Sequence, residues 1–315
     1  MKITFLGNFG VDYSSENHHK RSLEALGHEV IALQEGQVSG ENVLEAAQSC
    51  QMFVWVHTHG WVTPGFNMVA VLDHLKDLNI PTVTYHLDLW FGIERQKDLE
   101  NDEFYKHIGH FFTVDKLMAD WFNEHTEVKG HYLRAGVFGE ECNIDPDDNP
   151  LAKTHEIIFV GSRGYHPEWQ WRPQLIDWLK QTYGDRFEHY GGDGLGTIRG
   201  QELNHLYQTT KVVVGDSLVL NFDYPYYWSD RVYETMGRGG FLLMPEIKGL
   251  YEEFTPNELA TFKFGDFDDL KKKIDFYLKN DVYRDAMRRN GHHKVKHNYT
   301  YKHRWATILK ELNLT

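Results

Sequence analysis

The hydrophobic and polar positions of the first half alternate between two periods. Short, almost continuously apolar runs predict strands at residues 2–7, 29–33, 52–57, 82–87 and 110–114. Amphipathic stretches predict helices near residues 16–26, 40–49, 66–78, 98–107 and 115–124. Apolar strands that alternate with helices are typical of a parallel sheet covered on both faces, and therefore of a doubly wound α/β domain.

A second alternation of the same kind fills the rest of the chain. It predicts strands at residues 157–161, 187–191, 211–217, 240–244 and 260–265. It predicts helices near residues 170–183, 201–208 and 229–238, followed by a helical tail over 268–312 that breaks near Gly291. Between the two alternations, residues 139–156 are rich in Asp, Asn and Pro, which indicates an interdomain linker.

The expected architecture is two Rossmann-like, doubly wound parallel-sheet domains that face a central cleft, with a C-terminal helical tail. The first domain is placed at residues 1–145 and the second at 146–300. Residues 301–315 are expected to form a helix that crosses back to the first domain.

Composition agrees with a globular protein and makes the two halves differ in charge. Hydrophobic residues are 41% of the 315 and charged residues 25%. Residues 1–148 hold 24 acidic and 10 basic side chains, a net charge of −14, whereas the remainder is close to neutral and ends basic. An acidic surface repels a phosphate backbone, so the first half disfavours nonspecific nucleic-acid binding.

Several sequence features predict a cytoplasmic protein without a membrane span. No apolar run approaches the roughly 20 residues that a spanning helix needs. Residues 1–10 read directly into a strand, without the regions of a secretory signal. Cys50 and Cys142 stand far apart and are expected to be reduced thiols. The sequence leaves the oligomeric state open.

Common cofactor motifs do not occur. The glycines of "GNFG" (7–10) lack the spacing of a dinucleotide fingerprint, and no Walker phosphate loop is present. The 19 histidines, including His57 and His59, show no spacing typical of a zinc site. We therefore expect neither a metal nor a resident cofactor.

Candidate ligand-binding residues are those that directly follow a strand, because ligands of doubly wound sheets bind at the carboxyl ends of the strands. In the second half these positions include Gly161, Ser162, Arg163, Gly191, Gly215, Asp216 and Ser217. In the segment "FVGSRGYHPEWQWR", Arg163 and Arg172 suit a diphosphate, since guanidinium groups bind phosphate oxygens in bidentate fashion. The alternative is that both arginines form surface ion pairs with Glu168 and Asp177.

Three longer stretches carry a family resemblance. They are "FVGSR…R", "GQELNHLYQTTKVVVGDS" and "SDRVYETMGRGGFLLMPEIKGLYEEF". Over residues 157–312 the chain resembles the nucleotide-sugar domain of GT-B glycosyltransferases, and among them the CgeB-like, or spore-maturation-type, group. Over residues 1–140 only the fold pattern and "HYLRAGVF" agree with that family.

The resemblance implies a role for each residue of the third stretch. Glu234 stands where such enzymes hold the ribose hydroxyls of the donor, which a carboxylate can accept. Arg231 is implied as a diphosphate ligand. Gly237, Gly239 and Gly240 fall where the helix would approach the donor. Positions 215–217 and 191–193 would face the base and the sugar.

One position departs from the family pattern. Many retaining members carry a second Glu eight positions before the ribose Glu, and here that position is Tyr226. This leaves the donor sugar and the stereochemical outcome open, and neither Asp223 nor Asp230 can be ranked as a substitute.

The catalytic group is expected in the first half, which would hold the acceptor. Asp88 leads, followed by His59 and His86, because an inverting transfer needs a general base near the acceptor hydroxyl. The alternative for Asp88 is a helix N-cap.

We therefore expect a glycosyltransferase that moves a sugar from a nucleoside diphosphate sugar, foremost a UDP-sugar, to an unidentified acceptor. A small molecule, glycan or protein is favoured over nucleic acid as that acceptor. The alternatives are an epimerase or phosphorylase of the same fold, a non-catalytic binding module, and a glycosyltransferase that acts on modified DNA bases.

Overall fold

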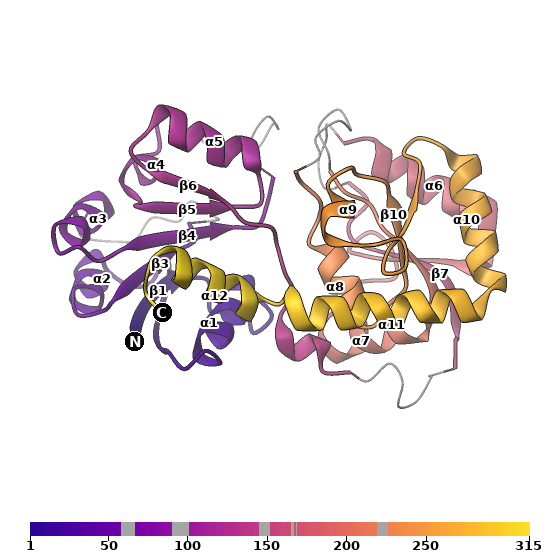
Figure 1. Ribbon diagram of the computed structural model, residues 1–315, viewed down its shortest axis with the longest axis horizontal. Helices are drawn as coiled ribbons and strands as arrows, with labels where there is room; N and C mark the ends of the chain where they lie inside the picture. The colour runs from indigo at the N-terminus through magenta and orange to yellow at the C-terminus, as the bar shows by residue number, and fades with distance from the viewer. Residues whose placement is uncertain (58–66, 90–100, 145–151, 165–166, 168, 219–225) are drawn as a thin grey trace. The chain divides into compact units, whose positions relative to one another are not determined.

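The computed structural model describes residues 1–57, 67–89, 101–144, 152–164, 167, 169–218 and 226–315. It divides into two compact units, which are described separately (Figure 1). Unit 1 comprises Met1–Ala135 and Tyr301–Thr315, and unit 2 comprises Gly136–Thr300. The last helix of the chain therefore belongs to unit 1.

Unit 1 is built on a six-stranded parallel sheet of order β2-β1-β3-β4-β5-β6. Its strands are β1 (Lys2–Gly7), β2 (Glu29–Gln34), β3 (Met52–Trp55), β4 (Thr82–His86), β5 (His110–Thr113) and β6 (Lys129–Tyr132). Its helices are α1 (Ser15–Glu24), α2 (Gly40–Ala47), α3 (Met68–Asp77), α4 (Phe104–His107), α5 (Lys116–His125) and α12 (Tyr301–Glu311). One face of the sheet packs against α2, α3, α4 and α5.

Helix α12 is held to unit 1 by buried aromatic groups. It packs against α1, as Figure 1 shows. Trp305 is fully buried, and its indole Nε1 donates a hydrogen bond to His19 Nδ1 over 3.1 Å. Burial lowers the pKa of His19 to about 3, so this ring is neutral and can accept the bond.

Unit 2 is built on a five-stranded parallel sheet of order β11-β10-β9-β7-β8. Its strands are β7 (His155–Val160), β8 (Phe187–Tyr190), β9 (Thr210–Val214), β10 (Leu242–Pro245) and β11 (Ala260–Phe262). Its helices are α6 (Trp171–Tyr183), α7 (Gly200–Thr209), α8 (Arg231–Gly237), α9 (Leu250–Glu253), α10 (Phe267–Lys279) and α11 (Asp281–Asn298), with short 3₁₀ turns at Gly139–Cys142 and Gly184–Arg186.

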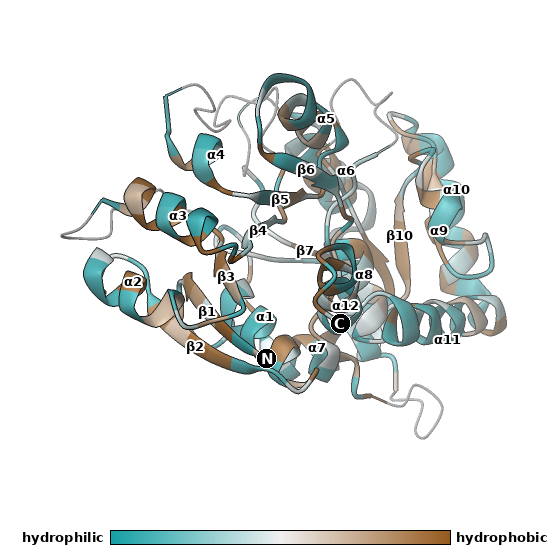
Figure 2. Ribbon diagram, turned by 60° about the vertical axis from the view of Figure 1, so that its left-hand side comes forward, coloured by the Kyte–Doolittle hydropathy of each residue, from teal (hydrophilic) through white to brown (hydrophobic). Residues whose placement is uncertain are grey.

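The pattern of hydrophobic residues explains how helices cover the sheet of unit 2. Ile157 and Phe159 point to the face that α6 and α10 cover with Leu175, Leu179 and Ile274. Figure 2 shows β10 in hydrophobic colours, whereas α11 is largely hydrophilic. The expected fold class, two parallel-sheet α/β domains with a helical C-terminal region, is thus confirmed.

Three local expectations differ from the structure. Strand β6 was not predicted, because "KGHY" contains no run of apolar residues. The helical tail does not break at Gly291, which lies inside α11, but at Asn280 and around Tyr299–Thr300. A Cβ at Gly291 would lie 2.7 Å from the carbonyl oxygen of Glu258, so this glycine serves close packing rather than a helix end.

The segment expected to be a linker is packed in its first part. Residues 139–142 form a 3₁₀ turn of unit 2, and Cys142 is fully buried there. Glu141 forms an ion pair with the buried Arg238 at the end of α8. Residues 145–151 lie outside the described residues.

The burial of Trp305 predicts that unit 1 needs α12 for its stability. Trp305→Ala should lower the free energy of unfolding by about 3–5 kcal/mol, because it leaves a cavity and an unpaired His19. Urea denaturation measures this loss. Phe276→Ala, at an aromatic residue with 45% of its surface exposed, is the control and should cost far less. Equal losses in the two variants would contradict the anchoring role of Trp305.

Candidate functional site

The strand order of unit 2 places a crevice over the ends of β7 and β9. From β7 the chain first passes to β8 on one side, and then to β9, β10 and β11 on the other. In open α/β sheets such a reversal leaves a gap at the carboxyl ends of the two strands, where ligands bind. Gly161 follows β7, and Gly215 follows β9, so these two glycines flank the crevice.

The side chain of Arg231 lies against both glycines. A Cβ at Gly161 would stand 2.7 Å from Arg231 Nη2, and one at Gly215 would stand 3.8 Å from Arg231 Cδ. Gly161 also has a φ of +138°, which side chains rarely adopt. The guanidinium group sits 5.0 Å from the ring centroid of Phe159. Glycine after β7 is therefore what lets this arginine lie across the strand end.

Arg231 is a partly buried cation that forms no direct ion pair among the described residues. Its Nη1 is buried and has no hydrogen-bond partner among the described residues. Burial lowers the pKa of Arg231, and the neighbouring Arg172 cation lowers it further. A guanidinium group remains protonated even so, which makes this site electropositive.

The second arginine of the site already has a partner. Arg172 Nε donates to Asp216 Oδ2 over 2.8 Å, and its Nη1 donates to the backbone carbonyl of Ser162 over 3.2 Å. The same Asp216 oxygen accepts from Trp169 Nε1 over 3.0 Å. The other Asp216 oxygen is buried and has no hydrogen-bond partner among the described residues. Two cations thus share one carboxylate, which leaves an excess positive charge at the strand ends.

Arg163 behaves as the surface alternative predicted. Its guanidinium forms an ion pair with Asp177, while its backbone N–H donates to Asp193 Oδ1 over 3.2 Å. Glu168, the other expected surface partner, lies outside the described residues. Arg163 is thus near the crevice but engaged elsewhere, whereas the neighbouring Arg172 is held in the interior.

Two further candidate positions shape the strand ends through the backbone. Ser217 is buried, and its Oγ accepts a hydrogen bond from the backbone N–H of Ser229 over 3.0 Å, which fixes the approach to α8. A Cβ at Gly191 would lie 2.5 Å from the carbonyl oxygen of Gly161, so β8 and β7 could not come this close with a larger residue.

Glu234 lies one helical turn after Arg231 on α8. Its partly buried carboxylate forms no hydrogen bond or ion pair with the described residues. Burial raises the pKa of Glu234 to about 7, and the nearby Asp230 carboxylate adds to the rise, while Arg238 opposes it. A carboxylate in this state can accept hydrogen bonds from a ligand that replaces the water it has lost.

The glycines at the end of α8 serve packing inside unit 2. A Cβ at Gly237 would lie 2.8 Å from Cys142 Sγ, and one at Gly239 would lie 2.2 Å from Ile144 Cδ1. Gly239 has a φ of +80°. A Cβ at Gly240 would meet the Thr235 side chain at 2.9 Å. These packing contacts explain why small residues stand at the three positions, and no ligand is needed for that explanation. Contact of Gly239 with the donor stays a prediction.

The residue that departs from the family pattern is exposed. Tyr226 is 37% exposed, and Asp230 Oδ1 accepts a hydrogen bond from Ser229 Oγ over 3.1 Å. Asp223 lies outside the described residues.

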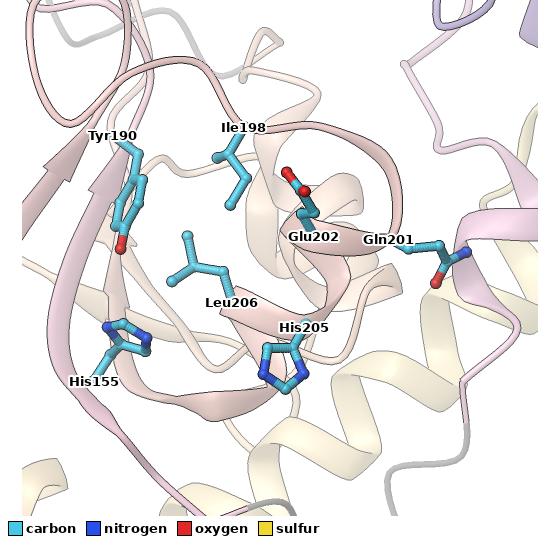
Figure 3. Close-up of a pocket in the computed structure, with 7 residues that line it drawn as sticks. All are labelled: His155, Tyr190, Ile198, Gln201, Glu202, His205 and Leu206. Atoms are coloured by element: carbon cyan, nitrogen blue, oxygen red, sulfur yellow. The ribbon is translucent and has the colours of Figure 1, made fainter.

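A separate cavity lies beside the edge strand β8 (Figure 3). It has a volume of about 450 Å³, and Tyr190, Ile198 and Leu206 surround its apolar part, with His155 and His205 below them in this view. Tyr190 belongs to β8, and Leu206 belongs to α7. None of the described residues that line the cavity is an Arg or a Lys, so this lining does not suit a diphosphate.

Of the catalytic residues expected in unit 1, the structure describes His86 and Asp88. His86 is buried, with 1% of its surface exposed, and its ring stacks on Phe111 at a centroid distance of 5.9 Å. Asp88 follows β4 and is partly exposed. Asp115, another strand-end residue, is the N-cap of α5 and accepts a hydrogen bond from Leu117 N–H over 3.0 Å. His59 lies outside the described residues.

A different group of residues meets at strand ends in unit 1, and the sequence analysis did not select it. His57 lies between two carboxylates, Glu35 and Asp102, at nitrogen–oxygen distances of 3.4 Å and 3.0 Å. The sequence analysis considered His57 only among the histidines that show no metal-site spacing. No sequence spacing joins positions 35, 57 and 102, so only the fold reveals their contact.

Neither a metal site nor a membrane-spanning helix is found among the described residues. No group of three His, Cys, Asp or Glu side chains in this part of the chain could hold a metal ion. No helix that the structure describes is long and apolar enough to cross a membrane.

Comparison with known proteins assigns a domain to this geometry. Residues 172–310 match the model of a family described as glycosyl transferase-like. The match covers most of unit 2 and extends into α12 of unit 1. None of the curated proteins matches the chain.

Solved structures establish the fold of the whole chain. An α-glucosyltransferase bound to UDP-glucose and DNA with an abasic site aligns at a TM-score of 0.70, with 12% identity over 99% of both chains. HepE of Anabaena, bound to UDP and glucose, aligns at 0.66, with 13% identity over 100% of both chains. Sucrose-phosphate synthase of Thermosynechococcus elongatus aligns at 0.59, with 12% identity over 99% of both chains. The fold is that of GT-B glycosyltransferases.

The raised pKa of Glu234 predicts a stability that depends on pH. The ordinary pKa of this carboxyl is 4.5, and in the folded protein it is about 7. Between these two pH values the unfolded state therefore ionises the carboxyl while the folded state does not. The free energy of unfolding therefore falls as the pH rises through this window. Glu234→Gln should raise it by about 1–3 kcal/mol at pH 8 and leave it unchanged at pH 4.

Urea denaturation at both pH values measures the effect. Glu202→Gln, at an exposed position on α7 of the same unit, is the control and should change neither value. A Glu234→Gln variant that gains no stability at pH 8 would contradict the burial cost assigned to this carboxylate.

Proposed function

We propose that this protein is a glycosyltransferase that transfers a sugar from a UDP-sugar, or another nucleoside diphosphate sugar, to an acceptor bound by unit 1. The observation that carries the proposal is the partly buried guanidinium of Arg231, which lies across the end of β7 and forms no ion pair among the described residues. A diphosphate supplies both the negative charge and the acceptor oxygens that this group needs. The glycosyl transferase-like domain supports the proposal.

The residues of the crevice suggest how the donor is held. Arg231 binds the diphosphate, and Arg172 stands behind it, fixed by Asp216. Gly161 keeps the strand end open for backbone contact with a phosphate. Glu234 accepts the ribose hydroxyls, for which its carboxylate has no competitor among the described residues.

The remaining assignments extend this proposal. Gly191, Gly215 and Ser217 shape the walls that face the base and the sugar. The CgeB-like group stays our assignment within the GT-B fold, and we propose a metal-independent reaction. Cys50 and Cys142 are free and buried, which supports a cytoplasmic location.

The acceptor is proposed to be a small molecule, glycan or protein. Modified DNA is the second candidate, since one of the similar structures is an α-glucosyltransferase with DNA bound. The net charge of −14 over residues 1–148 opposes this candidate. Asp88, His59 and His86 stay proposals for the catalytic groups.

Arg231→Met tests the donor site. The affinity for UDP should fall about 30- to 150-fold, because two charge-assisted hydrogen bonds are lost. The same substitution should not lower the melting temperature of the unliganded protein, because it removes a buried charge without a partner. Calorimetric titration with UDP and thermal denaturation give the two values.

A matched variant makes the test specific. Arg186→Met removes an exposed arginine that pairs with Glu156 in the same unit, and it should leave the UDP affinity unchanged. If Arg231→Met binds UDP as tightly as the wild-type protein, the proposed donor site is contradicted. If both variants lose the same affinity, the effect comes from the net charge of the protein and not from a contact with Arg231.

DNA binding separates the two candidate acceptors. We expect the wild-type protein to show no measurable affinity for duplex DNA at 0.15 M salt, since its acidic half repels phosphates. A fluorescence anisotropy titration over a range of salt concentrations checks this. Tight binding with a steep salt dependence would favour modified DNA as the acceptor instead.

A further inference from the structure

The ionisable side chains around His57 stand at the strand reversal of unit 1. From β1 the chain passes to β2 on one side and to β3 on the other, so the crevice of this unit lies over the ends of β1 and β3. Glu35 directly follows β2, and His57 lies two residues beyond β3. Because β1 lies between these strands, the two side chains meet across its carboxyl end.

The contacts form a chain that runs from the interior to the surface. Glu35 has 3% of its surface exposed, and its Oε1 accepts from Trp55 Nε1 over 3.0 Å and faces His57 Nδ1 at 3.4 Å. On the other side of the ring, His57 Nε2 stands 3.0 Å from Asp102 Oδ2. The Asp102 side chain is 38% exposed. A reactant can therefore reach the triplet through Asp102.

The backbone at His57 is held in an unusual conformation. Its φ is +52°, in the left-handed region that residues other than glycine seldom occupy. Two neighbouring aromatic rings pack against the imidazole, since the centroids of Trp55 and Phe104 lie 4.6 Å and 4.5 Å from it. Such strain costs about 1–3 kcal/mol and is concentrated at functional sites.

The charges of the triplet suit a group that takes up a proton. Burial lowers the pKa of His57, but the hydrogen bonds to Asp102 and Glu35 outweigh this and raise it above the ordinary value. An imidazolium between two carboxylates carries one net negative charge, so one further proton makes the triplet neutral. Asp102 Oδ1 also accepts from the N–H of Phe104 over 3.0 Å.

We propose that Asp102, in place of Asp88, His59 or His86, is the catalytic base for the acceptor hydroxyl, and that His57 and Glu35 are the positioning residues that orient it. This inference rests on the proposed glycosyltransferase function. The acceptor oxygen forms a bond to the anomeric carbon, and its proton passes to Asp102. The bond from that carbon to the diphosphate oxygen breaks, and the nucleoside diphosphate leaves with the electron pair.

A purely structural ion pair is the competing explanation. His107 and Asp73 form such a pair in the same unit, with 2.7 Å between His107 Nδ1 and Asp73 Oδ1. Asp73 lies on α3 and His107 on α4, away from the strand ends. Their substitution therefore provides a matched control.

Hydrolysis of UDP-glucose tests the proposal without knowledge of the acceptor, because water can take the acceptor's place. Asp102→Asn keeps the size of the side chain and its cap on Phe104, and it should lower kcat by about 100-fold or more. Both Asp102→Asn and Asp73→Asn should bind UDP with an affinity within twofold of the wild-type value. Asp73→Asn should also retain kcat.

Glu35→Gln distinguishes positioning from a structural role. Loss of the buried negative charge lowers the pKa values within the triplet, so the acid limb of the kcat profile, which reports protonation of the base, should shift to lower pH, while Asp73→Asn leaves the profile in place. Thermal denaturation confirms that each variant is folded.

Each result decides one claim. If the wild-type protein neither binds UDP nor turns over with water or with a panel of hydroxyl acceptors, the proposed function fails and this inference fails with it. If the wild-type protein turns over and Asp102→Asn keeps its rate within threefold, only the assignment of Asp102 is overturned.

Discussion

A partly buried arginine that forms no ion pair is the constraint around which unit 2 is arranged. Burial of a cation is costly unless another group compensates its charge. Asp216 and Asp230 raise the pKa of Arg231 only from a distance, since the Asp216 carboxylate is hydrogen-bonded to Arg172 and Trp169 and not to Arg231. The proposed donor diphosphate would supply the direct partner that the described residues lack.

Packing elsewhere in unit 2 keeps this group in position. Glycine at 161 leaves room for the guanidinium, and the ring of Phe159 lies beneath it. At the other end of α8, Arg238 donates to Asn204 Oδ1 over 2.5 Å and pairs with Glu141, which ties the helix to α7 and to the turn at Gly139–Cys142. The helix is thus fixed at its far end while Arg231 and Glu234 retain unused hydrogen-bonding capacity. These two unpaired side chains lower the free energy of unfolding, but they remain available to bind a ligand.

The sequence predicted this architecture well and the chemistry less completely. Apolar runs such as "MFVW" and "KVVV" specify buried parallel strands on their own, so the fold class followed from local pattern. Arg231 and Glu234 could be selected because the stretch that contains them resembles the donor site of known glycosyltransferases. The Glu35–His57–Asp102 triplet could not, since its members come from three separate segments whose contact depends on strand order. Strand β6 was missed because its position, beside β5, is set by tertiary pairing rather than by its own residues.

A crystal structure with UDP-glucose bound tests the central claim most directly. We predict that the diphosphate lies at the ends of β7 and β9, with a phosphate oxygen within hydrogen-bond distance of Arg231 Nη1 and the ribose hydroxyls on the Glu234 carboxylate. A nucleotide bound instead in the cavity beside β8, or on unit 1, would contradict the account.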